Sequence, residues 1–214
     1  MFEARSEAGL AALARVARAH HTVHMVLGDQ DNVESFWHYY SPDQSASFAS
    51  CRELMFQLKR PALVAADSSL LRLARAEDME ALLPVHAEMA FRESGINPLE
   101  KDPHGFRQRY LRRIEKDRVW VAIEDGRLLF KTDVALHTSD TVYLEGVHVN
   151  PEMRGTGLGC GLLTQVTDTL LKEARSVCLL VNEENILAQR LYLKAGFEFQ
   201  GYYKTIFVRP GALN

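Results

Sequence analysis

Apolar residues from position 69 onward recur at spacings that predict a short strand followed by two helices. Residues 70–94 begin as a strand and continue as a helix, with Asp78 as a plausible N-cap. The apolar face of this helix carries Leu82, Val85 and Met89. Pro84 should bend or interrupt the helix, because proline donates no backbone hydrogen bond. A second helix is predicted after Pro103, with apolar residues four apart at Phe106, Tyr110 and Ile114.

The segments that follow have strand spacing and then return to helical spacing. Residues 118–124 and 127–137 are β-rich runs on either side of Asp125 and Gly126, a strong hairpin signal. Residues 141–149 supply a third strand. After Pro151 a glycine-rich stretch leads into a helix whose core-facing residues are Leu158, Leu162, Val166 and Leu170.

The C-terminal segments complete a mixed order of helices and strands. Residues 176–181 read as a buried strand, residues 186–196 as a short helix with Gly196 as its C-cap candidate, and residues 197–208 as one or two strands. A strand, a helix and a strand in sequence imply a parallel pair joined by a right-handed crossover, whereas the hairpin implies antiparallel neighbours. The predicted fold class is α/β in the α+β sense, with a mixed, mostly antiparallel sheet that contains one parallel crossover.

The first 68 residues also carry the pattern of a folded segment, so the predicted division is 1–68 and 69–214. The smaller part reads as a helix over 10–19, a strand over 24–28, a helix from Asn32 and a strand near 62–67. Aligning residues 24–40 with the strand and helix after residue 176 matches three pairs: Leu27 with Leu180, Asn32 with Asn185, and Tyr39 with Tyr192. The segment is either a degenerate half-copy of the C-terminal fold or an unrelated αβ layer at one edge of the sheet.

Four glycines at alternate positions, from Gly155 to Gly161, precede the helix predicted after Pro151. Bare backbone lets several N–H groups approach one pyrophosphate, and the positive end of the helix points to the same place. Arg154 can add a charge-assisted contact. The loop lacks the lysine of a nucleotide-binding P-loop and the GxGxxG spacing of a dinucleotide fold. A glycine-rich turn that only shapes the backbone is the alternative.

Two segments resemble the GNAT superfamily of N-acetyltransferases. Arg154, Gly157 and Gly159 match its acetyl-CoA signature of Gln or Arg, two residues, Gly, one residue, and Gly or Ala. The strand before the signature resembles the family's fourth strand, with Val147 and Val149 alternating along it. The second segment matches at Asn185, Ala188, Tyr192, Gly196 and Phe197. The resemblance covers roughly residues 69–209 and implies a GNAT-like sheet.

The resemblance also implies how acetyl-CoA is held as cosubstrate. The pyrophosphate would lie on the amides of Gly155, Thr156, Gly157, Leu158, Gly159 and Cys160, beside Arg154. The pantetheine arm would pair with the strand segment Val147, His148 and Val149, where two parallel strands splay apart. Asn185 either fixes the end of this arm or caps the helix after it, and both roles can coexist.

Two side chains are the catalytic candidates for acetyl transfer to an amine. Tyr192 is placed to donate a hydrogen bond to the departing CoA thiolate, the alternative being a buried core tyrosine. Glu145 is the candidate general base, because strand alternation puts it on the side of Val147 and Val149; a water chain is the alternative.

Four further residues near these candidates are interpreted mainly as surface or packing residues and not as catalytic ones. Lys131 and Asp133 are second-rank candidates for the acceptor site, with solvated surface as the favoured explanation. Direct attack needs no acyl-cysteine, so Cys160 reads as a small helix residue. The His148 side chain reads as packing on the face opposite Glu145.

Composition removes several other classes of function. The net charge is −3 and Lys and Arg are scattered, which disfavours nucleic acid and membrane surfaces as partners. No apolar run reaches the roughly 20 residues of a membrane span and the start lacks a signal peptide, so a cytoplasmic location is expected. Three cysteines without CxxC spacing and eight histidines without ligand spacing predict no disulfide and no metal.

The predicted function is acetyl-CoA-dependent transfer of an acetyl group to a primary amine of a small molecule or peptide, by direct attack in a ternary complex. The protein is expected to be a monomer or a homodimer. The alternative is a non-catalytic acyl-CoA-binding sensor module, which would keep the glycine loop but not need the two catalytic candidates.

Overall fold

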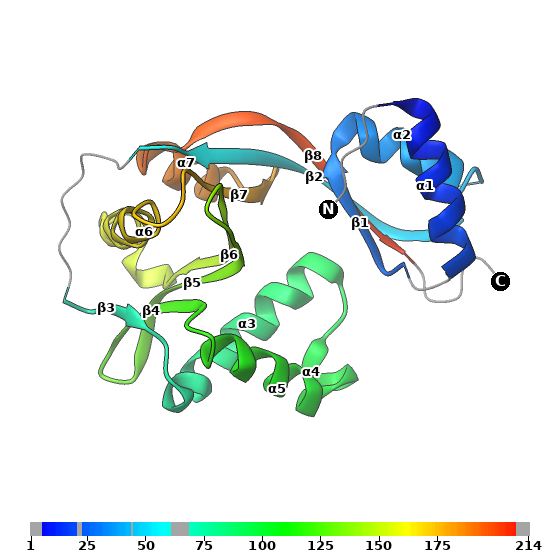
Figure 1. The fold of residues 1–214 in the computed structure, drawn as a ribbon. Coiled ribbons are helices and arrows are strands. Elements are labelled where there is room, and N and C mark those ends of the chain that lie inside the picture. Colours follow the sequence, from blue (N-terminus) through cyan, green and yellow to red (C-terminus); the bar gives the residue numbers. More distant parts are fainter. Residues whose placement is uncertain (1–5, 21–22, 44, 61–68, 209–214) are drawn as a thin grey trace. The chain divides into compact units, whose positions relative to one another are not determined.

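The computed structural model describes residues 6–20, 23–43, 45–60 and 69–208 (Figure 1). The chain forms two compact units, and each unit is built from segments that are not contiguous in the sequence. The first contains residues up to Met55, Leu180–Ile186 and the chain from Phe199 onward. The second contains Phe56–Leu179 and Leu187–Glu198. These units cut across the predicted division at residue 68, and the half-copy relationship stays a prediction.

The first unit packs two helices on strands that include one antiparallel pair. Helices α1 (Glu7–His20) and α2 (Gln30–Tyr40) flank strand β1 (Met25–Asp29) in sequence. β1 pairs antiparallel with β8 (Glu198–Val208), whose neighbour on the other side is β2 (Ser47–Leu58). The core consists of buried residues from the helices, the strands and the turn before β2: Leu10, Ala14, Val26, Val33, Phe36, Trp37, Tyr40, Ala46, Ile206 and Val208.

The second unit is built on five strands in the order β7-β6-β5-β4-β3. Their bounds are β3 Leu71–Leu73, β4 Val119–Glu124, β5 Arg127–His137, β6 Val142–Val149 and β7 Val177–Asn182. The pairs β3 with β4, β4 with β5, and β5 with β6 are antiparallel, whereas β6 and β7 are parallel. The helix α6 (Leu158–Leu170) connects β6 to β7.

The hairpin predicted at Asp125 and Gly126 is confirmed. Glu124 pairs with Arg127 across the turn, and the two turn residues have φ of 48° and 76°. Positive φ at both positions gives the tight turn whose twist matches that of the flanking strands, and Gly126 adopts it without steric cost. The turn sets the register of the pairs next to it, and the register shifts once further along, between Ala122 and Ile123.

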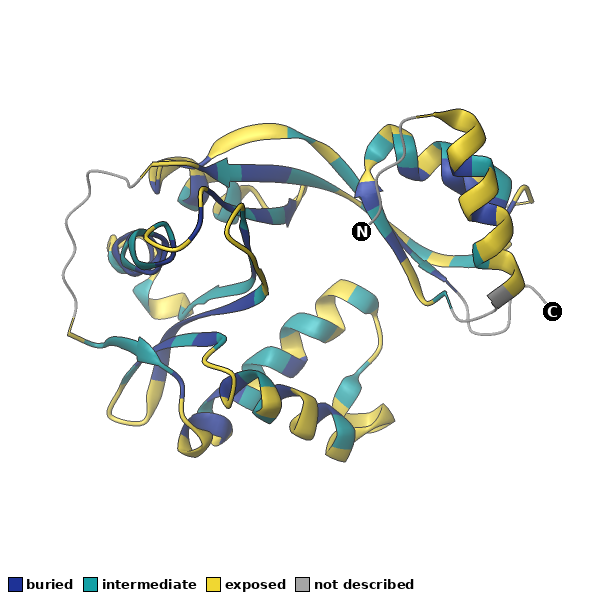
Figure 2. Ribbon diagram, viewed as in Figure 1, coloured by how far each residue is buried: buried dark blue, intermediate teal, exposed yellow. Residues whose placement is uncertain are grey.

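Helices cover both faces of this sheet. Helices α3 (Met79–Ser94), α4 (Pro98–Lys101) and α5 (Pro103–Ile114) lie on one side of β4, β5 and β6, and α6 lies on the other (Figure 1). Most of α6 is buried (Figure 2), including the predicted core residues Leu162, Val166 and Leu170. On α5 all three predicted core residues, Phe106, Tyr110 and Ile114, are buried.

Two local expectations agree with the structure only in part. Pro84 does not interrupt its helix, because α3 runs from Met79 to Ser94 with Pro84 inside it. Asp78 occupies the N-cap position of α3, but its carboxylate binds the Arg72 guanidinium at 2.6 and 2.8 Å. Strand β2 was not predicted, and the strand expected near 62–67 lies outside the described residues.

The short C-terminal helix agrees with its prediction. Helix α7 spans Ile186–Lys194, and Gly196 follows it with a φ of 88°. A positive φ after the last helical turn is the conformation for which glycine is favoured. The single strand β8 then continues to Val208.

Candidate active site

The glycine turn before α6 has the backbone conformation that the predicted anion site requires. Gly155 and Gly157 have φ of 79° and 92°, in the left-handed region that other residues rarely adopt. A Cβ at either position would find no atom within 4 Å, so both glycines border open space. Gly157 is also the N-cap of α6. An anion can therefore approach this backbone without meeting a side chain.

The first amides of α6 face this space without helical acceptors. The N–H groups in the first turn of any helix lack an intrahelical partner, and here they belong to Leu158, Gly159 and Cys160. The Thr156 hydroxyl accepts from the Leu158 N–H at 3.3 Å and donates to the Met153 carbonyl at 2.7 Å. The amides of Gly159 and Cys160 are left for an anion at the positive end of the helix.

Gly159 sets how closely α6 approaches the sheet. A Cβ at this position would lie 2.6 Å from Cγ2 of Val149, a separation that real Cβ atoms do not show. Val149 therefore projects toward α6, and the third glycine of the loop is needed for packing as well as for access. This contact places the start of α6 against the end of β6.

Strand β6 loses its parallel neighbour halfway along its length. The pairing with β7 covers Val142–Leu144, opposite Val177–Leu179, and no further pair with β7 is recorded for described residues of β6. In this second half of the strand, Glu145, His148 and Val149 pair with β5. Backbone groups of Val147 and His148 on the β7 side can thus pair with an extended ligand. The Val149 carbonyl accepts from Nε of Arg154 at 3.2 Å.

A β-bulge lies in β6 where it runs beside β5. Two pairs flank it: Lys131 with His148, and Asp133 with Glu145. Between these pairs β5 has the single residue Thr132, whereas β6 has Gly146 and Val147. Gly146 has a φ of 61°. The extra residue resets the alternation of side chains along β6.

The bulge corrects two expectations about β6. Directly opposed residues project to the same face, so Glu145 and His148 share the face of Asp133 and Lys131. Val149 and, by alternation, Val147 project to the α6 face instead. Glu145 is therefore not on the side of the two valines, and His148 is not on the face opposite Glu145. Strict alternation failed because one residue is inserted between them.

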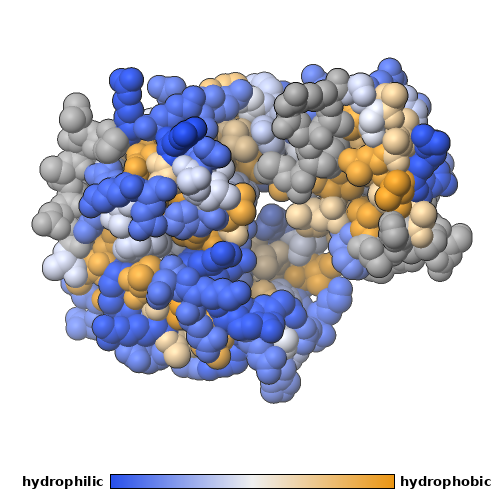
Figure 3. All heavy atoms as spheres, viewed as in Figure 1, coloured by the Kyte–Doolittle hydropathy of each residue, from blue (hydrophilic) through white to orange (hydrophobic). Residues whose placement is uncertain are grey.

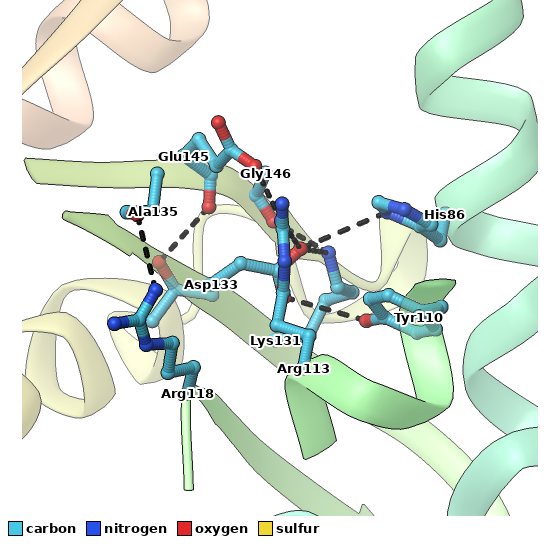
Figure 4. Close-up of polar contacts among 10 residues, drawn as sticks. His86, Tyr110, Arg113, Arg118, Lys131, Asp133, Ala135, Glu145 and Gly146 are labelled. Atoms are coloured by element: carbon cyan, nitrogen blue, oxygen red, sulfur yellow. Dashed lines mark hydrogen bonds and ion pairs between the residues drawn. The ribbon is translucent and has the colours of Figure 1, made fainter. Parts of the chain in front are cut away.

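Lys131 and Asp133 are fully buried, which overturns their interpretation as solvated surface. Their side chains are 0% exposed, and Nζ of Lys131 lies 3.0 Å from the Asp133 carboxylate. Nζ also donates to the carbonyl of Gly146 at 3.1 Å, so the lysine ties β5 to the bulge (Figure 4). Removing one partner of a buried ion pair costs about 3–5 kcal/mol. The pair is therefore a structural support for the bulge.

Side chains from α3 and α5 complete this cluster on the Glu145 face. The Tyr110 hydroxyl donates to Asp133 at 3.3 Å, and Nη1 of Arg113 lies 3.4 Å from the same carboxylate. Arg113 also forms an ion pair with Glu145 (Figure 4). Glu145 keeps 39% of its side-chain surface exposed, whereas Asp133 has none. Of these two carboxylates, Glu145 is the one that a ligand can reach.

Two histidines near the cluster are neutral at physiological pH. Burial, followed by the charges of Lys131 and Arg113, lowers the pKa of His86 to about 3. Burial, followed by Lys131 and Arg154, lowers the pKa of His148 to about 4. His86 stacks on the Tyr110 ring at 3.9 Å between centroids and holds that ring in place. No local sequence signal marked His86, Tyr110 or Arg113 as members of a polar site, because they belong to two helices that meet β5 and β6 only in the folded chain.

Tyr192 is buried on α7 among aromatic rings. Its ring lies 6.0 Å from those of Phe56 and Phe197, centroid to centroid. Burial raises the pKa of its phenol. The hydroxyl therefore keeps its proton at neutral pH and can act as a hydrogen-bond donor.

The remaining predicted residues, Cys160 and Asn185, lie at the N-terminal ends of helices α6 and α7. Cys160 is buried in the first turn of α6, and none of the described cysteines is in a disulfide. Asn185 directly precedes α7 and its backbone N–H donates to the Asn182 carbonyl at 2.9 Å.

Within the described residues, no three His, Cys, Asp or Glu side chains gather at a potential metal site. No helix in the described part of the chain is long and apolar enough to cross a membrane.

The comparison with protein families agrees with this geometry. Residues 115–199, which hold β4 to α7, match the model described as acetyltransferase (GNAT) domain. The GNAT resemblance seen in the sequence is thus confirmed over these residues, and the GNAT family is one whose members transfer acyl groups from acetyl-CoA. No curated protein matches the chain.

Solved structures share the fold at low sequence identity. A GNAT-family acetyltransferase from Colwellia psychrerythraea aligns over 97% of this chain and 75% of its own, with TM-score 0.60 and 17% identity. A GNAT-family protein from Novosphingobium aromaticivorans covers 97% and 83%, with TM-score 0.63 and 16% identity. A tandem GNAT protein from the clavulanic acid biosynthesis pathway covers 92% and 68%, with TM-score 0.58 and 16% identity. The predicted fold class is confirmed.

Proposed function

We propose that the protein is an N-acetyltransferase that moves the acetyl group of acetyl-CoA to a primary amine of a small molecule or peptide. The observation that carries the proposal is the arrangement along β6. Among the described residues its backbone has no pair with β7 beyond Leu144, its end meets the open glycine turn, and Glu145 lies beside the bulge between them. One strand thus combines a cosubstrate groove with a reachable carboxylate.

The residues at this strand fit the chemistry of acetyl-CoA. The open backbone at Gly155 and Gly157 and the amides of Gly159 and Cys160 suit a pyrophosphate, with Arg154 adjacent. The free edge of β6 at Val147 and His148 suits the amide groups of the pantetheine arm. Asn185, just before α7, contacts the end of the arm. When bound there, acetyl-CoA supplies the thioester carbon that the amine attacks.

The transfer needs a base and a proton donor. The amine attacks in its neutral form, a C–N bond forms, the C–S bond breaks, and the amine loses a proton while the thiolate gains one. Glu145 accepts the amine's proton directly or through water, with Arg113 orienting its carboxylate. Tyr192 donates its hydrogen bond to the developing thiolate, because burial keeps the phenol protonated.

The test of the proposal is whether amines accelerate the release of free CoA from acetyl-CoA, measured with a thiol reagent. An enzyme releases CoA faster when a suitable amine is present. A non-catalytic sensor would bind acetyl-CoA and show no amine-dependent release.

Glu145→Gln should lower the rate of transfer most at neutral pH and progressively less as the pH rises toward the acceptor's own pKa. A lysine-like amine has a pKa near 10.4, so a base is needed only while the amine is mostly protonated. Glutamine keeps the size and polarity of Glu145 but not its basicity. The pH profile of kcat/KM for both proteins gives the answer.

A loss of the same factor at every pH would mean that Glu145 positions the amine instead of deprotonating it. The absence of any loss would remove Glu145 from the mechanism and favour a water chain. Glu152→Gln is a suitable control, because Glu152 forms an exposed ion pair with Arg127, outside the polar cluster.

A further inference from the structure

A pocket of about 350 Å³ at the C-terminal end of α5 is lined almost entirely by cations. Its lining residues are Arg109, Arg112, Arg113, Lys116, Arg118 and Ala135. Figure 3 shows hydrophilic residues over α4 and α5 on the face in view. The net charge of the whole chain is −3, so this concentration of positive charge is local. Five like charges around one small volume repel each other, and a bound anion would relieve that repulsion.

Only two of the five cations have carboxylate partners among the described residues. Arg109 pairs with Asp102 at 2.9 Å, and Arg113 pairs with the buried cluster. Arg112, Lys116 and Arg118 have no described carboxylate within 4.0 Å. Arg118 donates from Nη1 to the carbonyl of Ala135 at 3.5 Å, which turns its guanidinium toward β5 (Figure 4). The pocket therefore has unneutralised donors that a ligand can use.

The pocket lies next to the candidate base and away from the glycine turn. Arg113 belongs to both, since it lines the pocket and pairs with Glu145. On β5, the lining residue Ala135 sits between Val134 and Leu136, which pair with Leu144 and Tyr143 at the beginning of β6. The glycine turn follows the other end of β6. A ligand in the pocket would thus reach Glu145 from the side opposite the cosubstrate's pyrophosphate.

We propose that this pocket binds a carboxylate or phosphate group of the acceptor, so that the acceptor is an amine that also carries an anion. The proposal rests on the proposed N-acetyltransferase function and narrows its substrate class. Guanidinium groups bind planar carboxylates and phosphates with paired hydrogen bonds, and Arg112 and Arg118 are available for this. The anion would anchor the acceptor and leave its amine free to reach Glu145.

The experiment compares acceptors that differ in one anionic group. Suitable pairs are γ-aminobutyrate with γ-aminobutyramide, glycyl-glutamate with glycyl-glutamine, and O-phosphoethanolamine with ethanolamine. We expect kcat/KM to be higher by about 10–100-fold for the anionic member of at least one pair, with the carboxylate and phosphate pairs telling the two groups apart. The preference should shrink as salt rises, because exposed charges are screened. Equal kcat/KM within every pair would overturn the proposal.

The variant Arg112→Gln/Lys116→Gln tests the pocket itself. Both residues are exposed and without carboxylate partners, so the fold should survive. The variant should lose the preference for the anionic acceptor through a higher KM, while kcat/KM for the neutral member stays unchanged. Arg107→Gln is the matched control on the same helix, since Arg107 does not line the pocket. An unchanged preference in the double variant, or an equal loss in the control, would contradict the proposal.

A separate experiment tests the anion site independently of the proposed acetyltransferase function. Titration of the cosubstrate-free protein with inorganic phosphate, followed by NMR, reports on the pocket whether or not any amine is acetylated. Phosphate shifts on the backbone amides of residues 109–118 that vanish in the double variant support the anion site. If phosphate causes no such shifts, the anion-site proposal is overturned. If acetyl-CoA binds and no amine is acetylated, the proposed function fails while the titration still decides whether the pocket holds an anion.

Discussion

Gly157→Asp is expected to lower the affinity for acetyl-CoA by about 100-fold or more while the protein still folds. Gly157 has a φ of 92° and borders open space at the start of α6, so an aspartate there projects a negative charge into the anion site. Like charges placed together in a binding site cost several kcal/mol. The side chain also strains a left-handed backbone. Isothermal titration calorimetry with CoA measures the loss directly.

The control variant Gly126→Asp separates the effect of a negative charge in the anion site from the effect of a strained left-handed backbone. Gly126 also has a positive φ, 76°, and a Cβ there also meets no atom within 4 Å, but it lies in the β4–β5 turn. The control should share the cost in stability and keep its affinity for CoA. Unchanged affinity in a folded Gly157→Asp protein would remove the glycine turn from the binding site.

Tyr192→Phe is expected to lower kcat by roughly 10–1,000-fold with little change in the dissociation constant of acetyl-CoA. A positioned proton donor contributes an effect of about this size. Because burial raises the pKa of Tyr192, the donor is present across the neutral range and its removal should not be masked by titration. Phenylalanine keeps the packing against Phe56 and Phe197. Steady-state kinetics and a separate binding measurement distinguish the two parameters.

Tyr40→Phe is the matched control, since Tyr40 is another buried tyrosine whose pKa is raised by burial, in the core of the first unit. It should leave kcat unchanged. Full activity of Tyr192→Phe would show that the Tyr192 hydroxyl has only a structural role.

Local sequence signals were enough for the parts of the fold that depend on a few adjacent residues. The hairpin at Asp125 and Gly126 follows from the backbone conformation those residues permit. The glycine turn follows from the same property at Gly155 and Gly157. Helix α5 follows from three apolar residues four apart. Each signal is contained within one segment, so no knowledge of the partner segment was needed.

The polar cluster could not be predicted from the sequence, because it depends on contacts between segments that are distant along the chain. Glu145 was assigned to the wrong face, since the bulge at Gly146 is visible only when β6 is paired with β5. Lys131 and Asp133 read as surface because charged residues are rarely buried unless paired, and part of their pairing comes from α5. An alternating strand pattern gives no indication of a helix that will cover its polar face.

The most direct test of the account is to follow where the acetyl group goes. Isotopically labelled acetyl-CoA would be incubated with the protein and a panel of primary amines that includes amino acids, peptides and aminoglycosides, and the products would be identified by mass spectrometry. We expect labelled amide formed in proportion to free CoA, with little product from Tyr192→Phe and little from Gly157→Asp. Tight binding of acetyl-CoA without labelled amide from any amine, or label found only in acetate, would contradict it.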